Sequence, residues 1–172
     1  MCIRDRTRIN DASLPRNVYV NPGNTPVGLT TTIKDAIDDI NTTSGIQIYA
    51  FNANPRPTGA NGYDVIWSVS PYGYGAEFVG DSGPSCAFYP AGEIYIALGD
   101  LNPDRIRKVA THELEHGLGF FEHSPFEGHM IFNYIDGTNN AKSLTQFEGK
   151  TIHLLYWLKD GTDLGKYDKL PE

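Results

Sequence analysis

The sequence predicts an α+β fold in which helices pack against a twisted mixed sheet. This fold class follows from the order of the predicted elements, which is a strand, a helix, several strands and then helices. The 172 residues, 40% hydrophobic and 20% charged, suit one soluble domain with a single core. The net charge of −7 argues against nucleic acid as a partner. No apolar run approaches the ~20 residues that cross a bilayer, so we expect no membrane span.

Periodicity and turn residues define the first elements. Ile33, Ala36, Ile37 and Ile40 recur on one face of a predicted helix, for which Thr30 to Thr32 offer N-caps and Gly45 a C-terminal stop. Alternating or apolar runs bounded by Gly, Pro and Asn predict strands over residues 17–20, 46–51, 63–69, 76–79, 85–89 and 93–98.

The second predicted helix carries a His-Glu-x-x-His motif at His112, Glu113 and His116. Asn102 before a proline predicts its start, and Gly119 predicts its end. Residues four apart lie one above the other on a helix face, so both imidazoles can reach one Zn²⁺. Glu113 points beside that metal, where it can accept a proton from a water that the metal activates.

Residues further along make the chain resemble the metzincin zinc metallopeptidases, and among them the matrixin-like enzymes. Their signature continues the motif with x-x-Gly-x-x-His and a methionine turn. Gly119 matches the glycine, and Met130, with Tyr134 four residues on, matches the methionine turn. Residues 144–156, with a capping box from Thr145 to Glu148, resemble the last helix of that family. The resemblance implies a mostly parallel sheet with an antiparallel edge strand, two long helices packed on it and a C-terminal helix.

The resemblance also implies a zinc endopeptidase, whose third metal ligand stays open between two residues. The family's third ligand comes ten residues after the first histidine, at Glu122 here, whereas His123 lies one residue later. An inserted residue would make His123 the ligand, and His123-Ser124 resembles the family's His-Ser pair. Without an insertion Glu122 binds, which agrees with the interval from His112 to Met130. We favour His123, because neutral imidazole suits zinc, and keep Glu122 as the alternative.

The family resemblance places a protein or peptide substrate along the edge strand, expected at residues 85–89 with Phe88 and Tyr89. Phe132 stands where the family usually has proline and would help to form the S1′ pocket, with Tyr134 nearby. Met130 would be a hydrophobic floor beneath the metal. Residues 70–85 contain no histidine for the family's structural zinc, so we expect one catalytic zinc and leave calcium open.

The remaining expectations concern the whole chain. Residues 1–6 resemble a translated sequencing-adapter string, so the catalytic domain is expected at 7–172, secreted, with a signal peptide lost upstream. Nothing demands more than a monomer. His129 is expected to be a partly exposed loop residue and His153 a structural one. Two alternatives stay open: a catalytically inactive zinc-binding interaction domain, and an accidental motif in a domain without metal.

Overall fold

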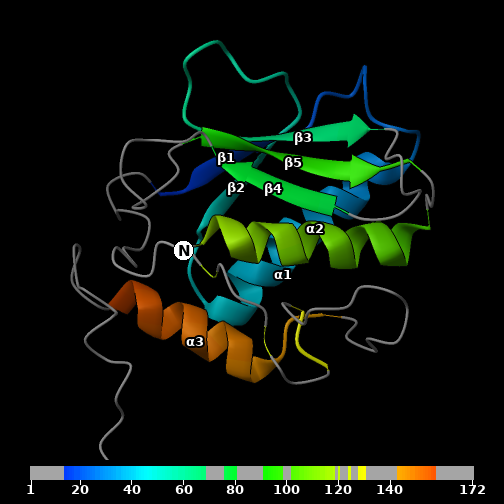
Figure 1. The fold of residues 1–172 in the computed structure, drawn as a ribbon. Helices are drawn as coiled ribbons and strands as arrows, with labels where there is room; N and C mark the ends of the chain where they lie inside the picture. The colour runs from blue at the N-terminus through cyan, green and yellow to red at the C-terminus, as the bar shows by residue number, and fades with distance from the viewer. Residues whose placement is uncertain are drawn as a thin grey trace, which may run out of the picture.

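The computed structural model describes residues 14–68, 76–80, 91–98, 102–118, 120, 124, 128–130 and 143–157, with backbone alone for 76–80 (Figure 1). One five-stranded sheet has the order β2-β1-β3-β5-β4. Its strands are β1 (Arg16–Tyr19), β2 (Tyr49–Asn52), β3 (Gly62–Ser68), β4 (Ala76–Gly80) and β5 (Ala91–Ala97). β1 pairs in parallel with β2 and β3, and β3 with β5, whereas β4 runs antiparallel to β5 at the edge. The predicted α+β fold, mostly parallel with one antiparallel edge strand, is confirmed.

The helices lie on one side of this sheet (Figure 1). They are α1 (Leu29–Ser44), α2 (Pro103–Gly117) and α3 (Gln146–Trp157). α1 and α2 pack on each other and on the strands, and α3 packs on α1 farther from the sheet. Within the described ranges, none of these helices has the length and apolarity to cross a membrane.

The apolar stripe of α1 forms much of the core, as predicted. Ile33, Ala36, Ile37 and Ile40 are each at most 1% exposed, and burying each isoleucine side chain stabilises the fold by roughly 1.5–3 kcal/mol. Gly45 ends the helix in the left-handed conformation, at φ 72°.

The predicted start of α1 at Thr30 to Thr32 is wrong, because these threonines lie inside the helix. Gly28 is the N-cap, at φ 85°, and its side-chain-free backbone turns the chain into the helix without a side-chain cap hydrogen bond.

The predicted strand at residues 85–89 lies outside the described residues. Within the described sheet the antiparallel edge strand is β4, over residues 76–80.

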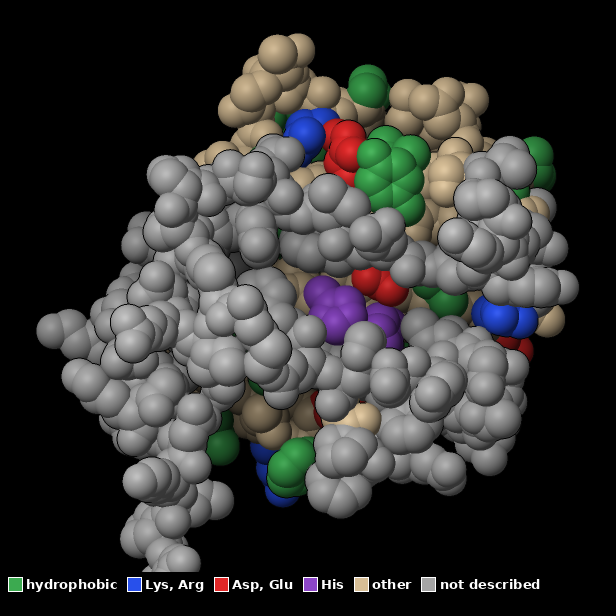
Figure 2. Space-filling model, viewed as in Figure 1, with side chains coloured by type: hydrophobic (Ala, Val, Ile, Leu, Met, Phe, Trp, Pro, Cys, Tyr) green, Lys and Arg blue, Asp and Glu red, His purple; other side chains and the backbone are tan. Residues whose placement is uncertain are grey.

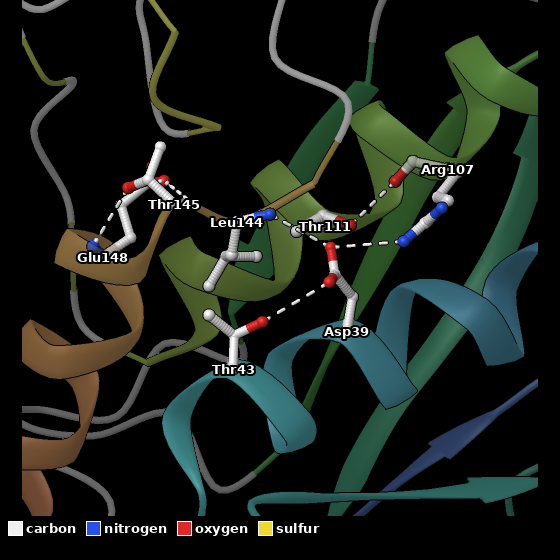
Figure 3. Close-up of polar contacts among 7 residues, drawn as sticks. All are labelled: Asp39, Thr43, Arg107, Thr111, Leu144, Thr145 and Glu148. Carbon is white, nitrogen blue, oxygen red and sulfur yellow. Dashed lines mark hydrogen bonds and ion pairs between the residues drawn. The ribbon is translucent and has the colours of Figure 1, made fainter.

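One carboxylate joins the three helices near the N-terminus of α3. Asp39 of α1 accepts a hydrogen bond from the backbone N–H of Leu144 (3.1 Å) and forms an ion pair with Arg107 of α2 (3.4 Å). Figure 3 shows Asp39 between these two partners, with Thr43 one turn further along α1. The start of α3 is therefore tied to both of the helices that pack on the sheet.

Candidate metal centre

The helix that carries the motif begins where the sequence predicts. The side chain of Asn102 accepts hydrogen bonds from the backbone N–H groups of Asp104 (2.9 Å) and Arg105 (3.3 Å), which have no partner within the helix. Pro103 occupies the first helical position, where its missing N–H costs nothing. These local contacts determine where α2 starts.

His112 and His116 lie together on that face. Their Nε2 atoms are 3.1 Å apart, and the rings meet edge to face with centroids 4.7 Å apart. His112 is buried, at 3% exposed, whereas His116 is half-buried. Histidine side chains, with an acidic one beside them, are visible near the middle of the face in Figure 2. His112 is thus enclosed by the protein, whereas His116 keeps part of its side chain exposed.

A backbone carbonyl orients each imidazole through Nδ1. Nδ1 of His112 is 2.7 Å from the carbonyl oxygen of Met130, and Nδ1 of His116 is 2.5 Å from that of Phe120. A carbonyl oxygen can only accept, so each Nδ1 must be the donor and carry the hydrogen. In the neutral ring this leaves Nε2 with an unshared lone pair. Two such lone pairs at 3.1 Å repel each other unless a cation or an added proton lies with them.

The pair fits a zinc ion. Two nitrogen ligands at tetrahedral angles and Zn–N distances of about 2.0–2.1 Å stand ~3.3 Å apart, close to the separation of these Nε2 atoms. A zinc-bound histidine also usually donates its other N–H to a carbonyl or carboxylate, as both of these rings do. The donor set and its tautomers therefore suit Zn²⁺.

The two glutamates between the histidines differ in their surroundings. Glu113 follows His112 directly and is 4% exposed. Glu115 is 1% exposed, and its Oε2 atom has no hydrogen-bond partner within the part of the chain that the structure describes. Burial, with the carboxylates of Glu148 and Asp39 nearby, raises the pKa of Glu115 well above its ordinary value. Glu115 thus lies near carboxylates of α1 and α3, and Glu113 remains the glutamate that the motif predicts beside the metal.

Two tyrosines from the sheet hold the C-terminal end of α2. The hydroxyl of Tyr49 donates to the carbonyl of Leu114 (2.8 Å), and that of Tyr63 donates to the carbonyl of Gly117 (3.1 Å). These carbonyls lie in the last turn, where the helix itself supplies no partner. The two rings meet edge to face at 6.0 Å. The tyrosines therefore anchor the turn that carries His116.

This tyrosine pair has no motif in the sequence. The only available signal was that a buried tyrosine needs a partner for its hydroxyl. Gly117 belongs to the same contact, because a Cβ atom there would lie 2.9 Å from the Tyr49 hydroxyl and 3.1 Å from the Tyr63 ring. α2 ends at Gly117, two residues before the predicted stop, and Gly119 itself lies outside the described residues.

Met130 reaches the centre through its backbone. Its side chain is buried, at 2% exposed, as the expected hydrophobic floor requires, and its carbonyl orients His112. Its backbone N–H donates to Glu148 (2.6 Å). The capping box that the sequence predicts for Thr145 and Glu148 is confirmed, whereas no sequence motif connects Glu148 with the metal centre.

The other two described histidines match their expected roles. His129 is half-buried beside Ser124 (2.8 Å from Nδ1 to Oγ) and stacks on Phe147. Nδ1 of His153 is 2.9 Å from the carbonyl oxygen of Ser44 and joins α3 to the end of α1.

Both candidates for the third ligand, Glu122 and His123, lie outside the described residues. So do the residues expected to bind substrate, which are Phe88, Tyr89, Phe132 and Tyr134. Among the described residues no group of three or more His, Cys, Asp and Glu side chains could hold a metal ion.

Comparison with known proteins supports the fold. No protein-family model matches the chain, and no curated protein matches it by sequence. Among solved structures, archaemetzincin from Methanopyrus kandleri matches with a TM-score of 0.51 and 11% sequence identity, over 87% of this chain and 99% of that one. At this identity the similarity shows the fold alone, so the chain has a metzincin-like fold.

Proposed function

We propose that this protein is a zinc-dependent endopeptidase of the metzincin type. One observation carries the proposal: two imidazoles, each fixed by a carbonyl at Nδ1, direct their Nε2 atoms at each other 3.1 Å apart on a metzincin-like fold. A surface pair would have no reason for two carbonyl-fixed tautomers. A bound cation explains both the short separation and the tautomers.

His112 and His116 would hold the zinc, with His123 as third ligand and Glu122 as its alternative. When bound, Zn²⁺ lowers the pKa of a water molecule towards neutrality and polarises the scissile carbonyl. Glu113, adjacent to the first ligand, takes the proton of the attacking water on its carboxylate and passes it to the leaving amine. Each peptide bond cleaved therefore consumes one water and returns Glu113 to its ionised form.

The substrate would be an extended segment of a protein or peptide. β4 is the antiparallel one of the two edge strands of the described sheet and would add such a segment through main-chain hydrogen bonds. Phe88, Tyr89, Phe132 and Tyr134 are the side chains that we expect beside it. The remaining proposals are a matrixin-like subtype, one catalytic zinc with calcium open, secretion, a monomeric state and a domain over 7–172.

Metal content and proteolysis of three proteins test this function: wild type, Glu113→Gln and, as a matched control, Glu115→Gln. Wild type should carry about one zinc per chain by elemental analysis, digest casein, and lose that activity to a chelator. Glu113→Gln should retain the zinc and fold and lose about 100- to 10,000-fold in kcat, the usual contribution of a general base. Glu115→Gln changes a carboxyl that burial favours in its neutral form, so its activity should remain near that of wild type.

The outcomes separate the alternatives. Stoichiometric zinc without digestion of casein or of a peptide library would make the chain a zinc-binding interaction domain. Metal-free protein would make the His-Glu-x-x-His motif accidental, with a shared proton between the two rings in place of the cation. Full activity in Glu113→Gln would remove the assigned base.

A further inference from the structure

The carboxylate of Glu148 serves two different parts of the molecule. Its Oε2 atom accepts the backbone N–H and the hydroxyl of Thr145, both at 2.8 Å, which completes the capping box of α3. Its Oε1 atom accepts the backbone N–H of Met130 at 2.6 Å. The capping box needs only the first set of contacts. The hydrogen bond with Met130 directs this buried carboxylate, which is 5% exposed, at the segment beside the metal centre.

Met130 passes this contact on to a metal-binding side chain. Its N–H is held by Glu148 and its carbonyl oxygen lies 2.7 Å from Nδ1 of His112, so the backbone of one residue is bound on both sides. Hydrogen bonds to a carboxylate are shorter and stronger than those between neutral groups. The carbonyl that determines the tautomer and direction of the His112 ring is therefore positioned through the hydrogen bond between Met130 and the side chain of Glu148.

The support for Glu148 is itself tied to the helix of His112. Leu144, directly before the capping box, donates its N–H to Asp39, and Asp39 pairs with Arg107 of α2 (Figure 3). The contacts thus form a closed path that leaves α2 at Arg107, crosses Asp39 and the start of α3, and returns through Met130 to His112. This path connects the His112 ring to α1 and to the start of α3 as well as to its own helix.

We propose that Glu148 is a positioning residue of the metal centre, which holds His112 ready to bind through the backbone of Met130. The inference rests on the proposed zinc site, but its test separates the two. The probes are Zn²⁺ and Co²⁺ alone, added to the full chain.

Glu148→Gln is the decisive variant. A glutamine side chain has one acceptor oxygen and one NH₂ donor. The oxygen can accept from the N–H of Met130 or from that of Thr145, and the NH₂ group then faces the remaining N–H, with which it cannot form a hydrogen bond. Thr145→Ala is the matched control, because it removes the hydroxyl from the capping box and leaves Oε1 for Met130. Far-UV circular dichroism and thermal melts compare the folds. Competition with a chromogenic chelator measures zinc affinity, and visible absorption of the Co²⁺ form reports ligand geometry.

Glu148→Gln should bind zinc ~10-fold or more weakly, the size of loss found when a group behind a metal ligand is removed, and its Co²⁺ spectrum should change. Thr145→Ala should lower the melting temperature but keep zinc affinity within about two-fold of wild type and the Co²⁺ spectrum unchanged. Equal affinities in the two variants, with wild type binding zinc, would overturn the role of Glu148 and leave the zinc site standing. Wild type that binds neither metal would remove the zinc site and this inference together. Should Glu148→Gln not fold, Glu148→Asp, too short to reach both partners, is measured with the same expected result.

Discussion

The hydrogen bonds from Tyr49 and Tyr63 to α2 should stabilise the fold near neutral pH, and the contribution of Tyr63 should be lost at alkaline pH. Tyr63 is fully buried and donates to the Gly117 carbonyl. Tyr63→Phe keeps the ring and removes this hydrogen bond, so it should cost about 1 kcal/mol of the free energy of unfolding near neutral pH. Tyr49→Phe, which removes the bond to Leu114, should cost a similar amount.

Alkaline pH should remove the difference in the free energy of unfolding between wild type and Tyr63→Phe. Burial raises the pKa of Tyr63 to about 12, although the nearby Arg16 lowers it, whereas an unfolded tyrosine ionises near ~10. The folded pKa lies above the unfolded one, so the contribution is complete below pH ~10 and is lost as pH rises towards the folded pKa. At pH 11 the loss is about 1.4 kcal/mol. The advantage of wild type over Tyr63→Phe should therefore fall from about 1 kcal/mol to zero or slightly below.

Urea unfolding followed by far-UV circular dichroism at pH 8 and pH 11 measures this difference. Comparing the variant with wild type at each pH cancels the other titrating groups. Ile94→Val removes a methyl group from a side chain that is 1% exposed and should cost about 1 kcal/mol at both pH values. If the gap between wild type and Tyr63→Phe stays the same at pH 11, Tyr63 ionises as easily when folded as when unfolded, and the reasoning from its burial is wrong.

Two glycines provide further tests by thermal melts. Gly117→Ala, which in an ordinary helix would gain up to about 1 kcal/mol, should instead lose 1–3 kcal/mol as an order of magnitude, because the new Cβ meets the Tyr49 hydroxyl. Adding Tyr49→Phe should recover part of that loss; fully additive losses would contradict the contact. Gly149→Ala should lower the melting temperature more than Gly117→Ala does. The new Cβ would overlap the backbone carbonyl of Thr43 and separate α3 from α1. A stability equal to wild type would show that α3 does not pack this closely.

Local pattern determined much of the fold. The stripe from Ile33 to Ile40 became the buried face of α1 because the helical period places these side chains on one side. Asn102 and the pair Thr145–Glu148 start their helices because a cap acts within three residues. The cap of α1 was misplaced because Gly28 acts through its backbone and offers no side-chain signal.

The sequence by itself determined that His112 and His116 share a helix face with Glu113 between them, because that depends only on the rise and turn of a helix. Only the tertiary structure decided what surrounds them. The carbonyl of Met130, the hydroxyls of Tyr49 and Tyr63, and the carboxylate of Glu148 reach α2 or its metal face from distant segments of the chain. Spacing along a chain carries no record of such contacts, since they exist only once the sheet and the three helices have packed together.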